Sequence, residues 1–160
     1  QEEELKIKED IFNILVKDAE TPPPDSLIER ELKFMIEGMK YQIAQSGMKL
    51  EDSGFEPEKA TKEWREKAIF NTTGYMMLEA VAAAENIHVT QQDMEGEYEL
   101  LAKQTKQKVE DIQKRIMSNP DSLSQTTTKI VGQKAMNFIY SNCEFKFYKE
   151  GEAPEKEAES

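Results

Sequence analysis

The side chains most often used for catalysis and metal binding are scarce in this chain. It has one histidine, His88, and one cysteine, Cys143. A zinc site needs several such ligands at fixed spacing, and a nucleophilic serine or cysteine would need His88 as its base. His88 lies between Ile87 and Val89 in a short apolar segment, which is typical of a structural histidine. Cys143 is expected to be a small packed residue at the end of a helix, so the sequence predicts no metal site.

Carboxylates are plentiful but do not form a catalytic pattern. The chain has 32 Asp and Glu against 21 Lys and Arg. The acidic residues are spread along helical faces, where a solvated surface is their ordinary role. The seven glycines are too scattered to form a phosphate-binding loop. We therefore expect a protein without catalytic residues and without a cofactor.

Charge and composition narrow the class of partner. The formal charge of -11 disfavours nucleic acid, because nucleic-acid-binding proteins neutralise phosphates with clustered Lys and Arg. No window of roughly 18 apolar residues predicts a membrane span. A single cysteine fits a reducing compartment, and the acidic start from Gln1 to Glu4 is unlike a signal peptide. We therefore expect a cytoplasmic protein with neither nucleic-acid nor membrane partners.

Apolar residues spaced by three and four positions predict an all-α fold. We expect helices over about residues 3–17, 26–47, 58–85, 90–105, 109–116 and 121–141. The third helix, if uninterrupted, would be about 40 Å long at roughly 1.5 Å per residue, which indicates an elongated shape. The proportions of 38% hydrophobic and 33% charged residues favour the same shape over one round core.

Local signals place several helix ends. The prolines from Pro22 to Pro24 end the first helix, because proline lacks the amide donor. Ser26 with Glu29 has the spacing of a capping box, which predicts the start of the second helix. Thr90 with Asp93 predicts another helix start after a short extended segment.

The last quarter of the chain contains one long helix and an acidic end. Gly132 is the weak point of that helix, because glycine has a low helix propensity. A strand-like segment is expected over residues 144–148. Residues 150–160 have no apolar anchor and are expected to form a disordered tail after one helical domain over residues 1–149.

Methionine is the one residue type whose number suggests a binding role. The chain has eight methionines, among them Met35, Met39 and Met48. Flexible and polarisable methionine suits surfaces that bind many apolar partners. At helical spacing, however, methionine is also an ordinary core residue, so both roles stay open.

Three motifs in order resemble the C-terminal domain of bacterial trigger factor. The proline-led stretch from Pro24 to Glu31 is similar to the start of a long helix in that family. The stretch from Ala84 to Asp93 resembles its short extended link, and Lys134 to Asn142 resembles its final body helix. Order and spacing agree over about residues 6–147.

The resemblance implies an elongated helical body with two protruding helical arms. The arms would cover about residues 26–56 and 91–120, and the remaining helices would form the body. It implies an ATP-independent chaperone that cradles unfolded or nascent polypeptide. Family members also dock on the ribosome and isomerise proline, and the resemblance assigns those activities to domains that this chain does not contain.

Client-contacting residues are expected on both arms. On the second arm, the resemblance places contacts at Leu101, Thr105, Ile112 and Ile116, although threonine at 105 departs from the aromatic residue usual in the family. Packing within the arm is the alternative role of the other three. On the first arm, exposure near the tip points to Met39, Ile43, Met48 and Leu50.

Two other interpretations stay open at this stage. The link motif is shared with the helical peptide-binding domain of periplasmic parvulin-type chaperones. A helical interaction domain with one specific folded partner would have a similar pattern, and a homodimer is also compatible with it. Each alternative predicts binding without catalysis.

Overall fold

The computed structural model describes residues 2–144, which are all-helical apart from the connecting segments. In chain order the elements are α1 (Glu2–Lys17), α2 (Asp25–Gln45), the short 3-10 helix η1 (Leu50–Asp52), α3 (Pro57–Glu63), α4 (Arg65–Ala84), α5 (Gln91–Thr105), α6 (Val109–Met117) and α7 (Pro120–Asn142). The predicted all-α fold is confirmed. Residues 145–148 of the expected strand-like segment, and the expected tail over 150–160, lie outside the described residues.

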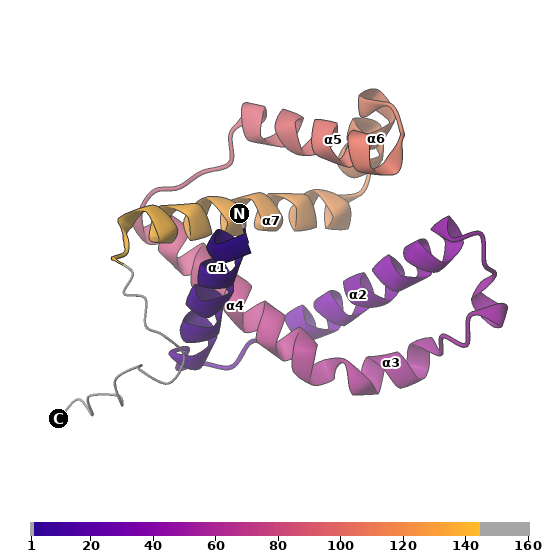
Figure 1. Cartoon of the computed structure of the whole chain (residues 1–160), viewed down its shortest axis with the longest axis horizontal. Coiled ribbons are helices and arrows are strands. Elements are labelled where there is room, and N and C mark those ends of the chain that lie inside the picture. The colour runs from indigo at the N-terminus through magenta and orange to yellow at the C-terminus, as the bar shows by residue number, and fades with distance from the viewer. Residues whose placement is uncertain (1, 145–160) are drawn as a thin grey trace.

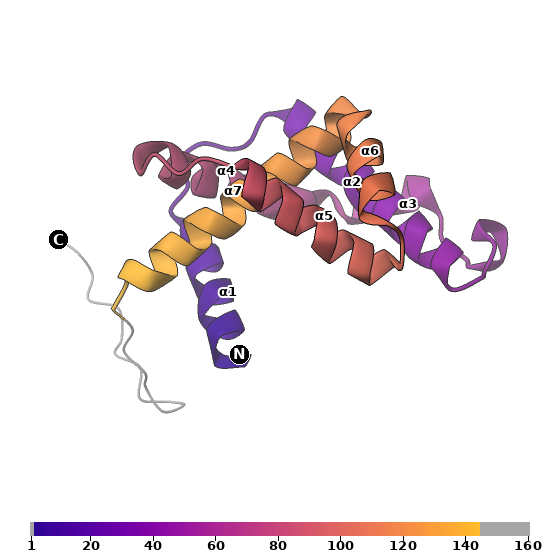
Figure 2. The ribbon, with the colours of Figure 1, turned by 90° about the horizontal axis from the view of Figure 1, so that it is seen from above.

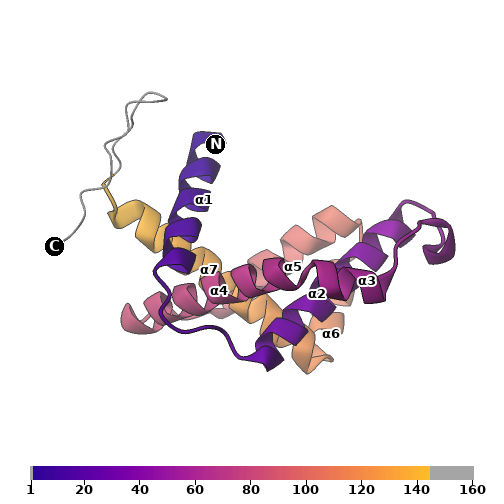
Figure 3. The same cartoon turned by 90° about the horizontal axis from the view of Figure 1, so that it is seen from below.

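Two hairpin-like helix pairs extend from a body formed by α1, α4 and α7. We call the pair of α2 and α3 the first arm and the pair of α5 and α6 the second arm. Figure 1 shows α2 and α3 projecting together to one side, while α5 and α6 lie above α7. The second pair contacts α7 through both of its helices, so it lies against the body along part of its length. Figures 2 and 3 show the same arrangement from above and below, with α1 standing apart from both pairs.

Helix α4 is the centre of the structure. It contacts α1, α2, α3 and α7, and its contact with α7 is the most extensive between any two described elements. Small residues on α4 let the other helices approach closely. Ala68 is fully buried against Ile28 and Leu32 of α2, and Ala82 is buried beside Ala135 of α7.

The described residues form three separate apolar clusters instead of one round core. They are a root cluster of Ile28, Leu32 and Ala68, a body cluster of Leu78, Ala82 and Ala135, and a hairpin cluster of Tyr98, Ala102, Ile112 and Ile116. The root cluster joins the first pair to α4, and the body cluster joins α4 to α7. The hairpin cluster lies wholly within α5 and α6. A chain with modest apolar content can form such small clusters along an elongated body.

The expected single helix over 58–85 is wrong in one respect, because the helix is interrupted at Trp64. Its backbone angles, φ -93° and ψ 1°, leave the helical region between α3 and α4. Hydrogen bonds from Trp64 N to Ala60 O and from Ala68 N to Trp64 O still cross this joint. Trp64 packs on the root cluster and lies 5.6 Å from the Phe55 ring, centroid to centroid. Tertiary packing of this large side chain accompanies a break that helical periodicity does not reveal.

Of the two predicted helix starts, the one at Ser26 is wrong and the one at Thr90 is confirmed. Ser26 is not the N-cap of α2, because the helix begins at Asp25 and is capped by Pro24 without a side-chain hydrogen bond. The carbonyl of Pro24 accepts the amides of the first turn instead. Thr90 and Asp93 form a complete capping box at the start of α5, as predicted.

Gly132 lies inside α7, and Cys143 differs from its expected role. Gly132 is buried, and a Cβ there would meet Tyr75 and Leu78 of α4 at 3.5 Å and 3.6 Å. It lies at the contact between α7 and α4, where a methyl group would make ordinary van der Waals contacts. Cys143 follows α7 and is exposed, so the expectation that it packs is wrong.

Gly74 gives the sharpest test of how α1 is attached to α4. A Cβ at Gly74 would overlap the ring of Phe12, which lies on α1 and also contacts Phe70 and Tyr75. Gly74→Ala should therefore lower the free energy of unfolding by about 1–3 kcal/mol, measured by urea denaturation. Combining it with Phe12→Ala should give a smaller loss than the sum of the two single changes.

Gly96→Ala is the matched control for this substitution. Gly96 is exposed on α5 and has no atoms within 4 Å of an added Cβ. Alanine there should raise stability by roughly 0.5–1 kcal/mol, because it has the better helix propensity. If alanine raised the free energy of unfolding equally at both positions, the packing of the Phe12 ring would not depend on Gly74.

Candidate functional site

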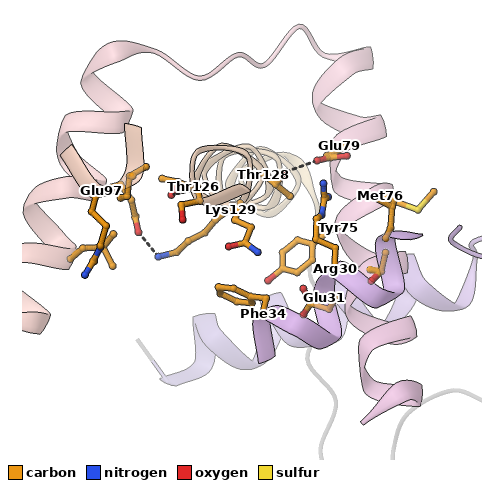
Figure 4. A pocket seen from close by; sticks show the side chains of 17 residues that line it. Arg30, Glu31, Phe34, Tyr75, Met76, Glu79, Glu97, Thr126, Thr128 and Lys129 are labelled. Carbon is orange, nitrogen blue, oxygen red and sulfur yellow. Dashed lines mark hydrogen bonds and ion pairs between the residues drawn. The ribbon is translucent and has the colours of Figure 1, made fainter. Parts of the chain in front are cut away.

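A groove of about 450 Å³ lies between the two helix pairs. Its walls come from α2, α4, the hairpin of α5 and α6, and the first half of α7. Figure 4 shows it from close by, with labelled side chains from α2, α4, α5 and α7 around it. The lining residues are Leu27, Arg30, Glu31, Phe34, Thr72, Tyr75, Met76, Glu79, Glu97, Leu101, Arg115, Ile116, Ser122, Gln125, Thr126, Thr128 and Lys129.

One side of the groove is apolar and aromatic. Phe34 on α2 is 52% exposed and Tyr75 on α4 is 37% exposed. Leu27 and Met76 lie beside them and are partly buried. Contiguous exposed side chains of this size mark interaction surfaces more often than isolated ones do.

The apolar surface continues from the groove along the first arm. Phe34, Tyr41 and Met48 are spaced by seven residues and are all at least 42% exposed. A seven-residue interval returns to nearly the same side of an α-helix, so Phe34 and Tyr41 share one side of α2. Met48 follows in the turn after α2, which brings apolar surface from the groove to the arm tip.

The opposite side of the groove is polar and comes from α7. Thr126 donates its hydroxyl hydrogen to the carbonyl of Ser122 at 2.8 Å, which is the usual bond of a helical threonine. Thr128 donates to the Glu79 carboxylate at 3.1 Å, and this bond joins α7 to α4. The groove therefore has one wall with large apolar side chains, which we call the apolar wall and which also carries Arg30, Glu31 and Glu79, and one wall rich in hydrogen-bonding groups.

Two ion pairs attach the second arm to α7. Lys129 of α7 lies 2.5 Å from the carboxylate of Glu97, which is only 6% exposed. Lys134 lies 2.6 Å from Asp93 at the start of α5, and it also donates to the carbonyl of His88 at 2.8 Å. Both lysines therefore determine where α5 lies on the body. A buried carboxylate such as Glu97 needs a partner of this kind, because an unpaired buried charge is strongly destabilising.

The pKa of Asp93 is strongly lowered at this junction. The hydrogen bond from Lys134 is the main cause that lowers the pKa of Asp93 to about 2, from an ordinary 3.8. The amide and hydroxyl of Thr90 also donate to this carboxylate and lower its pKa further. The start of the second arm is thus held by a carboxylate that stays ionised over a wide pH range.

The predicted contact residues of the first arm fall into two groups. Met48 and Leu50 are exposed at the tip of the first arm, at 49% and 38%. Met39 and Ile43 are partly buried on the same arm, and only Leu27, Arg30, Glu31 and Phe34 of α2 line the groove. The structure therefore does not bring the four predicted first-arm residues into the groove itself.

The predicted residues of the second arm lie closer to the groove. Leu101 and Ile116 line it, although Ile116 is only 4% exposed. Ile112 is fully buried in the hairpin cluster, which is the packing role that the sequence left open. Thr105 is partly buried, and its hydroxyl donates to the carbonyl of Leu101.

The sequence did not predict the apolar wall. Phe34 and Tyr75 lie at the groove but were not among the expected contacts. The spacing of Phe34, Tyr41 and Met48 was a usable signal for the first of these. No local pattern distinguishes Tyr75, because its position depends on how α4 meets α2 and α7.

The described part of the chain contains no group of side chains suited to bind a metal ion. Within residues 2–144, no three His, Cys, Asp or Glu side chains come together in a group that could hold a metal ion. None of the helices in this range has the length and apolar character needed to cross a membrane.

Sequence comparison relates this chain to one family. The family model for the C-terminus of bacterial trigger factor protein matches residues 1–141. A trigger factor from Halothermothrix orenii is 32% identical over 138 residues, which cover 84% of this chain and 32% of that protein. A trigger factor from Geobacter sp. (strain M21) is 25% identical over 134 residues, covering 84% of this chain and 31% of that protein. The chain thus spans about a third of the length of these curated relatives.

Structural comparison agrees at the level of the fold. A solved structure of domains of trigger factor from Thermotoga maritima aligns with a TM-score of 0.58 and 17% identity. The alignment covers 88% of this chain and 83% of that one. The body with two helix pairs is therefore an arrangement that the two chains share.

Replacement of Lys134 should change both the pKa of Asp93 and the pH dependence of stability. In Lys134→Met the pKa of Asp93 should rise from about 2 toward 3.8, without reaching it because the Thr90 bonds remain. A carboxylate with a lowered pKa stabilises the fold above its ordinary pKa, and this contribution is lost as the pH falls toward the folded value. The stability difference between the parent chain and Lys134→Met should therefore be full at about pH 5 and shrink toward about pH 2.5.

Carboxyl NMR titration and urea denaturation would measure these two effects. Lys33→Met is the matched control, because Lys33 on α2 is exposed and makes no hydrogen bond or ion pair with the described residues. It should leave the pKa of Asp93 unchanged. If the pKa of Asp93 were also unchanged in Lys134→Met, then Lys134 would not be the cause of its lowering.

Proposed function

Because this chain belongs to the family of bacterial trigger factor C-terminal domains, we propose that it is an ATP-independent chaperone domain that holds unfolded or nascent polypeptide in the groove between its arms. The observation that carries the proposal is the apolar wall around Phe34 and Tyr75, which stays exposed in a folded chain. The family match favours trigger factor over the parvulin-type alternative. We also propose that the domain works in the bacterial cytoplasm.

The shape of the site supports a holding function over a catalytic one. The groove is open, and its apolar side chains come from elements that the body holds apart. Several weak apolar contacts on one surface can add up by effective concentration, while each contact still dissociates quickly. Such binding would keep an unfolded segment from aggregating without an energy source.

We propose contact residues in two zones. In the groove they are Phe34, Tyr75, Leu101 and the exposed edge of Ile116. Along the first arm they are Met39, Ile43, Met48 and Leu50. Ile112 is not included, because its side chain has no exposed surface.

The matched relatives are about three times longer than this chain. The activity of a whole trigger factor therefore does not carry over to it directly. The resemblance assigns ribosome docking and prolyl isomerisation to other domains. We therefore propose neither activity for these 160 residues. The family model that matches is that of the C-terminus.

The direct test is suppression of aggregation without ATP. A chemically denatured enzyme is diluted into buffer with several-fold excess of this chain, and light scattering is followed. We expect suppression that depends on the concentration of the chain. A specific interaction domain for one folded partner would leave the scattering unchanged, and that result would reject the proposal.

Paired serine substitutions test whether the groove is the binding surface. Phe34→Ser with Leu101→Ser should weaken suppression, with an apparent affinity loss of about fivefold or more, because large side chains at the centre of an interface contribute most to binding. Leu5→Ser is the control, since Leu5 is 64% exposed on α1 and does not line the groove. Circular dichroism would confirm that each variant is folded. Equal losses in the control and the groove variants would place binding elsewhere.

A further inference from the structure

Helix α1 is attached to the body by few side chains and lines no part of the groove. Within α1 only Ile11 is buried, and among the described elements the helix contacts α4 and α7 alone. Phe12 and Leu15 pack on the body cluster, and Lys8 donates to the Asn137 side chain at 2.8 Å. Elements with few buried contacts belong to the least stable parts of a fold. The attachment of α1 therefore depends on individual side chains.

Phe12 is the side chain through which α1 touches a residue of the groove. Its ring rests on the backbone of α4 at Gly74, where an added Cβ would overlap the tip of the ring. The same ring lies edge-to-face with the ring of Tyr75, with 6.0 Å between the ring centroids and 72° between the ring planes. Aromatic pairs in this geometry stabilise each other beyond the area that they bury.

Tyr75 connects Phe12 to the groove. Its side chain is 37% exposed and lines the groove, where Figure 4 labels it beside other residues of α2 and α4. On α7, Gly132 lies against the same ring, because a Cβ there would be 3.5 Å from Tyr75 Cδ1. Gly74 and Gly132 have no side chains, so removal of the Phe12 ring would leave free space beside Tyr75. The Tyr75 ring could then turn into that space, away from the groove.

We propose that Phe12 is a positioning residue for the groove, and that it couples the attachment of α1 to the binding of a client. This inference rests on the proposed function and adds to it a residue that does not touch the client. When α1 is seated on α4, the Phe12 ring supports Tyr75 in the apolar wall. When α1 detaches, Tyr75 loses this support, and the wall loses one of its two exposed aromatic rings.

The coupling must act in both directions. If a seated α1 raises the affinity for a client by some factor, a bound client favours the seated state of α1 by the same factor. The contribution of one aromatic pair limits this factor to about tenfold, and we expect about threefold. Helix α1 would therefore respond to occupancy of a groove that it does not line.

A double-mutant cycle on peptide affinity tests the role of Phe12. The probe is a short, unstructured fluorescent peptide with one Phe and one Leu among Gly and Ser residues, and fluorescence anisotropy gives its dissociation constant. Phe12→Leu keeps an apolar anchor for α1 but removes the ring, so the peptide should bind about threefold more weakly. Tyr75→Leu removes the supported ring and should itself weaken binding. In the Tyr75→Leu background, Phe12→Leu should cause no further loss, because the contact through which it acts is gone.

Leu15→Val is the matched control within α1. Leu15 packs on the body cluster about one helical turn after Phe12, and it does not line the groove. Loss of one buried methylene group should loosen α1 about as much as Phe12→Leu does, as urea denaturation would verify. The affinity for the peptide should nevertheless stay unchanged. An equal loss of affinity in Leu15→Val would mean that any loosening of α1 weakens binding, which would overturn the role assigned to Phe12.

Amide hydrogen exchange tests the reciprocal effect. With the peptide at saturating concentration, the amides of residues 11–15 should exchange about threefold more slowly than in the free protein. In Tyr75→Leu the saturating peptide should leave these rates unchanged. Slowing of equal size in Tyr75→Leu would show that binding stabilises α1 by another route, and the coupling through Tyr75 would be rejected.

The outcomes distinguish this inference from the proposed function. The peptide can bind while Phe12→Leu leaves its affinity unchanged, or causes the same loss with and without Tyr75. In either case Phe12 is not a positioning residue, and the chaperone proposal stands. If the peptide does not bind and aggregation is not suppressed, the proposed function itself is rejected. Circular dichroism would verify that each variant is folded.

Discussion

The packing of α4 through small residues is the constraint on which the rest of the structure depends. Along one helix, Ala68 faces α2, Gly74 lies under the Phe12 ring of α1, and Ala82 meets Ala135 of α7. Ala68 and Ala82 meet their partner helices with only a methyl group, and Gly74 has no room even for that, because the Phe12 ring occupies the space. Three helices are thereby placed around one axis with few apolar residues. The same arrangement leaves α2 and α7 far enough apart to form two walls of the groove.

The two arms are attached by different forces. The first arm is joined to α4 by the apolar root cluster and by an exposed ion pair between Asp25 and Arg65. The second arm has its own apolar cluster, and ion pairs from Glu97 and Asp93 join it to α7. The position of the second arm on the body therefore depends more on charge than that of the first.

Local signals in the sequence predicted the elements well and the site only in part. The Thr90 and Asp93 capping box and the proline stop after α1 are short-range patterns, so they could be recognised without the fold. The break at Trp64 and the burial of Ile112 depend on which helix packs opposite, and the sequence pattern carries no such information. Phe34 lies outside the apolar face formed by Ile28 and Leu32, so the single apolar face that helical periodicity predicts for α2 does not include it. The groove joins residues about a hundred positions apart, which local periodicity cannot reveal.

The three separate clusters also predict an order for the events of folding. The hairpin cluster joins residues 98 to 116 only, so it closes a short loop and can form early. The body cluster must bring α4 and Phe12 of α1 to Ala135 and Ile139 of α7, which are separated by most of the chain. Such long loops close slowly, because their ordering entropy is lost before the contacts form. The groove takes one wall from α7, so a growing chain acquires its binding surface only when its last described helix has docked.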